Sequence, residues 1–357
     1  MKIAVNTGGG DAPGLNAVIR GIALAAYRKG WQAYGIKYGY RGLMDTSQIM
    51  RLTPETVWDI TNLGGTILGS AIKGNPFEYP RESADGKVMK TDISDLIVSN
   101  FKALEFDALI AIGGDGSLMI ANKFSKKGIP VIGIPKTIDN DICATDVSFG
   151  FDTAVNIATE AIDKLHTTAR SHDRVMVVEV MGRYVGWIAL YSGISGSADV
   201  ILVPEIPYDI EKVCRKIKQL DLIGQKYAIV VVAEGAKPVG GDFTVMEQNC
   251  GGVRLGGIGK KVADAIEDKS GKEARSIVLG HLQRGGPPTT FDRLLCLRFG
   301  TAAIKAVEEG KFGSMVSLRS SEIHTVPIED AIGQMKSVSG ESDIIMTARS
   351  LGISFGG

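Results

Sequence analysis

One stretch of the sequence, IPKTIDND at residues 134–141, ends a short apolar run with a cation, a hydroxyl group and two carboxylates. Lys136, Thr137, Asp139 and Asp141 could form a reaction centre in which one carboxylate accepts a proton and another lies near a metal ion. The same residue types also favour a polar turn that caps a helix. The stretch alone leaves both interpretations open, so the elements that position it must decide.

Apolar strands alternate with helices along most of the chain. The predicted strands are 2–7, 33–38, 107–114, 130–134, 174–180, 199–205, 227–234 and 274–280. The predicted helices include 15–29, 152–168, 184–193, 209–220, 258–269 and about 288–308. Continuous apolar strands between helices predict parallel sheets covered on both faces, in an α/β fold. A chain of 357 residues usually forms two domains, or one large α/β unit with a cleft.

Polar and glycine-rich clusters follow five of these strands at their carboxyl ends. They are TGGGDAPGLN, GGDGS, PKTIDND, MGRYVG and HLQRGG. Ligands bind at that edge of open α/β sheets, which favours an active site over five ordinary loops. Cations lie at strand ends or in loops, and several on the ligand edge would indicate anionic groups on the substrate; they are Lys73, Arg174, Arg183, Arg275 and Arg284. A lone arginine is more often a solvated or ion-paired surface residue.

Two glycine-rich turns enter helices, GGGDAPGLN at 8–16 and GGDGSLM at 113–119. Such turns offer unpaired backbone N–H groups and the positive end of a helix, which together can hold a phosphate. The chain has no GxxxxGK[ST] motif and no strand–GxGxxG–helix unit, which weakens a dehydrogenase interpretation. Two phosphate cradles, several arginines and a carboxylate pair make phosphoryl transfer the simplest hypothesis.

Composition excludes several other classes. Forty basic residues balance forty acidic ones, so nothing indicates a nucleic-acid or membrane-surface protein. The four cysteines form no CxxC pair, which argues against zinc or a disulfide framework and favours a reducing cytoplasm. The N-terminal MKIAVNTGGG is typical of a strand running into a loop and not of a secretory signal.

Six motifs, GGDAPGLN, GGTILGS, GGDGS, PKTIDND, VEVMGRYVG and GHLQRGG, resemble those of the 6-phosphofructokinase family and occur in that family's order. The resemblance extends from Lys2 to at least Ala303. Lys136 and the KGNPF at 73–77 resemble the mixed-substrate branch, which contains both ATP-using and pyrophosphate-using members.

The resemblance implies transfer of the γ-phosphoryl group of ATP to the 1-hydroxyl of fructose 6-phosphate, with Mg²⁺, in glycolysis. Asp139 would be the general base, Thr137 would orient the transferring group, Arg183 would complete the catalytic set, and Asp115 with Asp141 would hold Mg²⁺. The implied donor-binding residues are Gly10, Lys73, Gly74, Gly114, Asp115, Gly116 and Ser117. The implied sugar-binding residues are Thr137, Ile138, Asp139, Arg174, Met181, Gly182, Arg183, Glu234, Arg275, His281, Leu282, Gln283 and Arg284.

The resemblance also implies two doubly wound domains with the active site in the cleft between them. The phosphate-donor domain would comprise residues 1–150 and about 283–334, and the sugar domain 151–282 and about 335–357. Arg174 and Arg275 match positions that reach the 6-phosphate from a neighbouring subunit in the family. We therefore expect a cytoplasmic homo-oligomer, a dimer or tetramer, with no nucleic-acid or membrane partner.

Two positions bear on the phosphate donor. Pyrophosphate-dependent relatives replace the last glycine of GGDG by aspartate, and here that position is Gly116, which favours ATP. Lys136 resembles pyrophosphate users, so a pyrophosphate-dependent enzyme is the alternative. Lys73 stands where ATP-specific bacterial members carry arginine, and a lysine lacks the bidentate fork.

Two further classes remain as alternatives. A non-catalytic sugar-phosphate sensor on the same fold would show damaged chemistry, whereas Asp139 and its neighbours are present. A GGDG kinase acting on NAD or a lipid would share only the donor turn and would leave MGRYVG and GHLQRGG unexplained.

Overall fold

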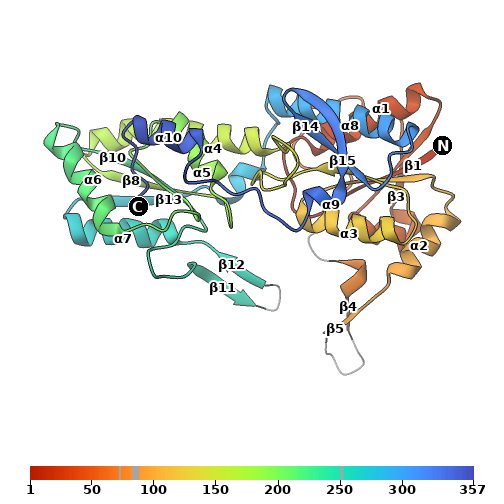
Figure 1. The fold of residues 1–357 in the computed structure, drawn as a ribbon, viewed down its shortest axis with the longest axis horizontal. Helices are drawn as coiled ribbons and strands as arrows, with labels where there is room; N and C mark the ends of the chain where they lie inside the picture. The colour runs from red at the N-terminus through yellow and green to blue at the C-terminus, as the bar shows by residue number, and fades with distance from the viewer. Residues whose placement is uncertain (72–73, 83–87, 250–251) are drawn as a thin grey trace. The chain divides into compact units, whose positions relative to one another are not determined.

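The computed structural model describes residues 1–71, 74–82, 88–249 and 252–357. The chain forms two compact units (Figure 1). The first unit comprises Met1–Asp152 and Arg284–Met335, and the second comprises Thr153–Gln283 and Lys336–Gly357. Within the described ranges, no helix is long and apolar enough to cross a membrane.

The first unit is built on a seven-stranded sheet with the order β15-β14-β7-β6-β1-β2-β3. Its central strands run parallel, and the edge strands β3 and β15 are antiparallel to their neighbours. The strands are β1 (Lys2–Thr7), β2 (Gln32–Ile36), β3 (Ile49–Leu52), β6 (Ala108–Gly113), β7 (Val131–Pro135), β14 (Ser314–Arg319) and β15 (Glu322–Pro327). The strands β6 and β7 are apolar and buried throughout because helices cover both faces of the sheet.

Helices α1 and α8 cover one face of this sheet, and α2 and α3 cover the other (Figure 1). The helices are α1 (Leu15–Arg28), α2 (Ser94–Ala103), α3 (Asp115–Lys126), α8 (Thr290–Glu308) and the short α9 (Ile328–Ala331), and a hairpin adds β4 (Tyr79–Glu82) and β5 (Val88–Thr91). Gly21 and Gly300 allow α1 and α8 to touch, since a Cβ on Gly300 would lie 2.7 Å from the Val18 carbonyl oxygen. Ile3 and Val5 belong to one core and Ala4 to the other, as the alternation of a strand requires.

The order of the strands creates a switch point at β1. The chain leaves β1 toward β2 on one side, whereas β6 lies on the other side of β1. The loops that follow β1 and β6 therefore diverge and leave a crevice at the carboxyl edge of the sheet. This crevice lies between the two glycine-rich turns.

The second unit is built on a four-stranded parallel sheet with the order β13-β8-β10-β9. Its strands are β8 (Val175–Val180), β9 (Val200–Leu202), β10 (Ala228–Ala233) and β13 (Ala274–Val278). Its remaining elements are α4 (Phe151–Ser171), which begins in the first unit, α5 (Trp187–Ser195), α6 (Ile210–Leu222), α7 (Ile258–Ser270), α10 (Asp343–Ser350) and the hairpin of β11 (Val245–Asn249) and β12 (Gly252–Leu255). The predicted α/β fold with mainly parallel sheets is confirmed.

Candidate active site

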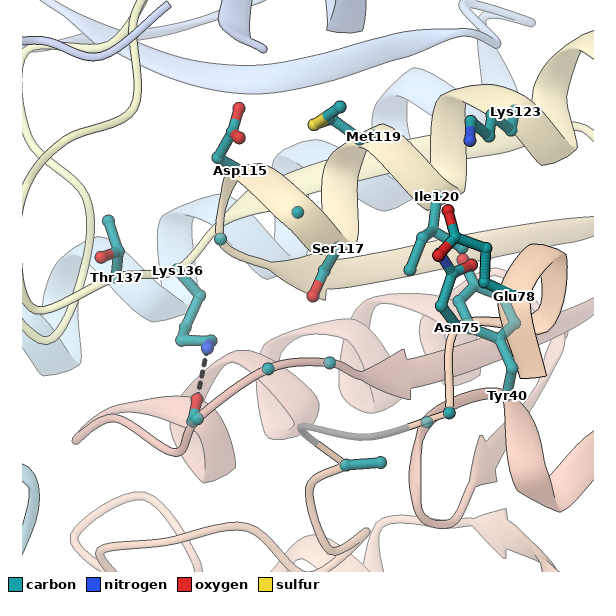
Figure 2. Close-up of a pocket in the computed structure, with 18 of the residues that line it drawn as sticks. Tyr40, Asn75, Glu78, Asp115, Ser117, Met119, Ile120, Lys123, Lys136 and Thr137 are labelled. Atoms are coloured by element: carbon teal, nitrogen blue, oxygen red, sulfur yellow. Dashed lines mark hydrogen bonds between the residues drawn. The ribbon is translucent and has the colours of Figure 1, made fainter. Parts of the chain in front are cut away.

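A cavity of about 510 Å³ opens at the switch point of the first unit (Figure 2). The loops after β1, β6 and β7 line it together with the first turns of α3. The structure brings six of the predicted donor residues to this cavity: Gly10, Gly74, Gly114, Asp115, Gly116 and Ser117. The seventh, Lys73, lies outside the described residues.

The amino end of α3 faces the cavity, with Asp115 and Ser117 in its first turn (Figure 2). The first N–H groups of a helix have no partner within the helix and attract anions. Gly8 allows Ser117 to approach β1, because a Cβ on Gly8 would lie 2.6 Å from the Ser117 Oγ. A Cβ on Gly116 would meet nothing within 4 Å, so this position is open toward a ligand.

Lys136 lies at one end of the cavity and is buried. Its backbone N–H donates to the Gly113 carbonyl at 2.9 Å, and its Nζ donates to the Gly10 carbonyl (Figure 2). Burial and then the charge of Arg284 lower the pKa of Lys136 to about 8. Sequence reasoning missed residues at the other end, which are Tyr40, Asn75, Glu78 and Ile120 (Figure 2).

Asp139 follows Thr137, which lines the same cavity. The Asp139 N–H donates to the Thr137 Oγ1 at 3.1 Å, which shapes the loop. Among the described residues, the Asp139 Oδ1 is buried and has no hydrogen-bond partner. Burial and then the charge of Asp141 raise the pKa of Asp139 to about 6. A carboxylate with an unused oxygen and a raised pKa is suited to accept a proton near neutral pH.

Hydrogen bonds to Ser148 fix the loop that carries Asp139. The Asn140 Oδ1 accepts from the Ser148 N–H at 3.1 Å, and the Ser148 Oγ donates to the Thr137 carbonyl at 2.9 Å. Asn140 has a φ of 53°, a left-handed conformation that asparagine tolerates better than most residues. Ser148 was missed by sequence reasoning, because a supporting hydroxyl has no signature of its own.

The segment Gly333–Met335 contacts one predicted magnesium ligand and the residue that follows the other. The Asp115 Oδ1 accepts from the Gly333 N–H at 3.1 Å, and Met335 forms an antiparallel bridge with Ile142, next to Asp141. No group of three or more His, Cys, Asp or Glu side chains suited to a metal occurs among the residues described. Two carboxylates fit Mg²⁺ nonetheless, since this ion usually takes one or two carboxylates and completes its shell with water and substrate phosphates.

In the second unit, MGRYVG follows β8 and HLQRGG follows β13, and these two strands are neighbours. The Met181 N–H donates to the Oε1 of the buried Gln283 at 3.4 Å, which ties the two loops together. The remaining predicted sugar residues at this edge are Gly182, Arg183, Glu234, His281 and Leu282.

Besides Thr137 and Asp139, two more predicted sugar residues belong to the first unit, Ile138 and Arg284. Ile138 is fully buried, so only its backbone is available to a ligand. The Arg284 Nη1 donates to the Asp11 carbonyl at 2.9 Å, and Arg284 lines the donor cavity beside Gly10.

Arg174 and Arg275 lie elsewhere. Arg174 precedes β8, and Arg275 is the second residue of β13, so both lie at the amino edge of the sheet. A six-residue strand such as β8 is about 20 Å long. Neither arginine therefore lies at the edge that follows the strands, where Met181 and His281 lie.

Comparisons with known proteins identify the family of this chain. A family model described as "Phosphofructokinase" matches residues 2–307. The chain is 51% identical over 99% of its length to "ATP-dependent 6-phosphofructokinase 2" of Clostridium perfringens, and it covers 98% of that protein. It is 48% identical over 96% of its length to "Pyrophosphate--fructose 6-phosphate 1-phosphotransferase" of Amycolatopsis methanolica, and it covers 97% of that protein.

A solved structure of Pichia pastoris phosphofructokinase in the T-state superposes with a TM-score of 0.81 at 29% identity. That likeness covers 99% of this chain, which spans 37% of the Pichia chain. The chain belongs to the phosphofructokinase family, and the predicted family is confirmed.

Proposed function

We propose that this enzyme transfers the γ-phosphoryl group of ATP to the 1-hydroxyl of fructose 6-phosphate and releases fructose 1,6-bisphosphate and ADP. Curated relatives near 50% identity over the full chain carry the name ATP-dependent 6-phosphofructokinase. The observation that carries the proposal is the donor cavity, where a helix amino end and two glycine-rich turns lie beside the loop of Thr137 and Asp139. This arrangement supports phosphoryl transfer, which depends on positioning and on stabilising phosphate charge.

In the proposed step, the 1-hydroxyl oxygen of the sugar attacks the γ-phosphorus and the bond to the ADP oxygen breaks. Asp139 accepts the proton of the hydroxyl through its unpaired Oδ1. Thr137 orients the transferring group, and the cations of Lys136 and Arg183 offset the charge on its oxygens. The N–H groups of Gly116 and Ser117 hold the donor phosphates.

Asp115 and Asp141 are proposed to hold Mg²⁺, which when bound would neutralise donor phosphate charge. The Gly333 N–H occupies the Asp115 Oδ1, so this bond orients the carboxylate and leaves the other oxygen for the ion. The donor set is all oxygen, which suits Mg²⁺ better than softer metals.

ATP is the proposed donor because Gly116 leaves the cavity open. A side chain at this position would point into free space, and the cavity continues to Tyr40 and Ile120, which leaves room for a nucleoside. Pyrophosphate is the second candidate, favoured by the buried cation of Lys136 and by a relative of that activity at 48% identity. An added cation helps either donor, whereas steric exclusion would discriminate between them.

The active form is proposed to be a homo-oligomer, most simply a tetramer. Arg174 and Arg275 lie about a strand's length from Met181 and His281 on the same sheet, so one chain cannot place all four around one sugar phosphate. A second copy could supply the two arginines.

A steady-state assay with fructose 6-phosphate and Mg²⁺, and with ATP or pyrophosphate as donor, tests the proposal. We expect fructose 1,6-bisphosphate to form with ATP and a much higher kcat/KM for ATP than for pyrophosphate. Product formed with pyrophosphate alone would establish the second candidate, and no product with either donor would reject both.

A further inference from the structure

A carboxylate joins the two arginines at the amino edge of the second unit's sheet. The Arg174 Nε donates to the Glu273 Oε2 at 2.6 Å, and the Arg275 Nη2 donates to the Glu273 Oε1. One carboxylate therefore uses both of its oxygens to bridge two guanidinium groups. A second carboxylate, Glu267, approaches only Arg275, at 3.8 Å.

The backbones of these residues are fixed by the sheet. The Val175 N–H donates to the Glu273 carbonyl at 2.9 Å, and Ala274 pairs with Val175 in the register of β13 and β8. The Ala228 N–H donates to the Arg174 carbonyl at 3.2 Å. The strands thus place Glu273 beside Arg174, with Arg275 two residues further along the neighbouring strand, opposite Met176. The like charges of the two arginines repel each other unless an anion lies between them.

We propose that Glu273 is a positioning residue that holds Arg174 and Arg275 together to receive the 6-phosphate of the sugar. This inference rests on the proposed function, in which the two arginines bind that phosphate. Glu273 takes the Nε edge of Arg174 and leaves both of its terminal nitrogens without a hydrogen bond in the described part of the chain. The two terminal nitrogens of an arginine form the fork that binds a phosphate through two parallel hydrogen bonds.

The electrostatics of the pair agree with this role. Hydrogen bonding by Arg174 lowers the pKa of the Glu273 carboxyl, which favours its ionised form. The Arg174 and Glu273 side chains are 31% and 36% exposed, so water screens the pair and its effect on stability is small. Positioning is then the larger effect of Glu273.

A negative charge near a phosphate also repels it, so the two possible roles of Glu273 predict opposite changes in sugar binding. If Glu273 merely competed with the phosphate, its removal would tighten sugar binding. If Glu273 positions the arginines, its removal lets them separate and weakens binding, although the net charge of the site becomes more positive. The direction of the change in KM therefore distinguishes the two roles.

The experiment measures KM for fructose 6-phosphate, KM for ATP and kcat in Glu273→Gln, with Glu267→Gln as the matched control. We expect Glu273→Gln to raise KM for fructose 6-phosphate about tenfold, with kcat and KM for ATP within about twofold. Glu267→Gln, which removes a carboxylate from Arg275 alone, should change each constant less than about twofold. Glu273→Asp keeps the charge on a shorter side chain and should give an intermediate KM.

Direct titration of fructose 6-phosphate, with thermal unfolding of each variant, separates binding from folding. An unchanged or lower KM in folded Glu273→Gln, or an equal rise in Glu267→Gln, overturns the inference. If Glu273→Gln does not fold, the KM of Glu273→Asp for fructose 6-phosphate is the test, and an unchanged or lower value overturns the inference. Arg174→Ala and Arg275→Ala test the proposed function separately: normal sugar binding in both would reject the assignment of the arginines themselves.

Discussion

The two units use the same architecture, yet they arrange their predicted ligand residues differently. In the first unit, the donor residues within the described ranges line one cavity at the carboxyl edge of the sheet. In the second unit, Met181 and His281 follow their strands, whereas Arg174 and Arg275 lie at the amino edge. The described predicted donor residues therefore share one cavity, whereas the predicted sugar residues of the second unit lie at two opposite edges of its sheet.

The difference follows from strand geometry. Loops that follow parallel strands lie at the same edge of the sheet, so the topology alone brings together residues that are far apart in sequence. A residue that precedes its strand lies at the other edge, at a distance set by the strand's length. Under the proposed function, donor binding would belong to one chain, whereas sugar binding would need the arginines of a second copy.

The largest expected effect is at Gly116. Gly116→Asp should lower kcat/KM for ATP by about 10³-fold or more, because a carboxylate beside the α-phosphate in a partly dry cavity repels it. The matched control is Gly116→Ala, whose added Cβ would meet nothing within 4 Å. This variant should lower kcat/KM for ATP less than about tenfold. Equal losses in both variants would mean that the backbone matters and the charge does not. A wild type that prefers pyrophosphate would show that Lys136 is the stronger determinant.

The next effect concerns the base. Asp139→Asn keeps the shape of the side chain but cannot accept a proton, so kcat should fall about 10²-fold or more with little change in either KM. Nucleotide binding measured by titration should be unchanged, since the donor cavity is intact. Near-normal turnover would remove Asp139 from the mechanism and would leave the first unit as a binding pocket only.

A smaller effect is expected when two inactive variants are mixed, because the sugar site is proposed to be shared between subunits. Arg275→Ala and Asp139→Asn subunits should each be nearly inactive alone, whereas their mixed oligomers should regain up to about a quarter of wild-type activity. That fraction is the chance that an intact base meets an intact arginine from a neighbour in a random mixture. Full activity in a verified monomer, or no recovery in verified mixed oligomers, would contradict a shared sugar site.

Much of the fold could be predicted because its signals are local. The apolar strands 107–114 and 227–234 of the sequence are β6 and β10 in the structure, with bounds shifted by one residue at most at each end. The hairpin of β14 and β15 was not predicted. Its turn residues, Ser320 and Ser321, have φ values of 48° and 80°, and serine gives no signal for a turn that usually selects asparagine or glycine.

Some residues of the site have a local sequence signal and others have none. Glycine-rich turns and carboxylates at strand ends are recognisable in the sequence, so Gly116 and Asp139 could be predicted. The Gly333 N–H that bonds Asp115, 218 residues away, leaves no trace in the sequence because any residue carries an N–H group. Glu273 was also missed, since an acidic residue before a strand is ordinary until its two partners are known.

The smallest expected effect is a pH dependence that distinguishes the base from its surroundings. In the proposed mechanism Asp139 acts as the base when it is ionised, and burial raises its pKa to about 6. The kcat/KM for fructose 6-phosphate should therefore fall as the pH drops through that value. Mg²⁺ bound at Asp141 would add positive charge nearby and would move this acid limb of the pH profile to lower pH. The loss of kcat/KM between pH 7 and pH 5.5 should therefore be about fourfold or less.

The charge of Lys136 lowers the pKa of Asp139, so Lys136→Met should move the acid limb to higher pH. Lys136→Arg keeps a cation and should leave the acid limb near its original position. The position of the limb is independent of how much activity each variant retains. A limb that stays in place in Lys136→Met would show that the titrating group is not Asp139.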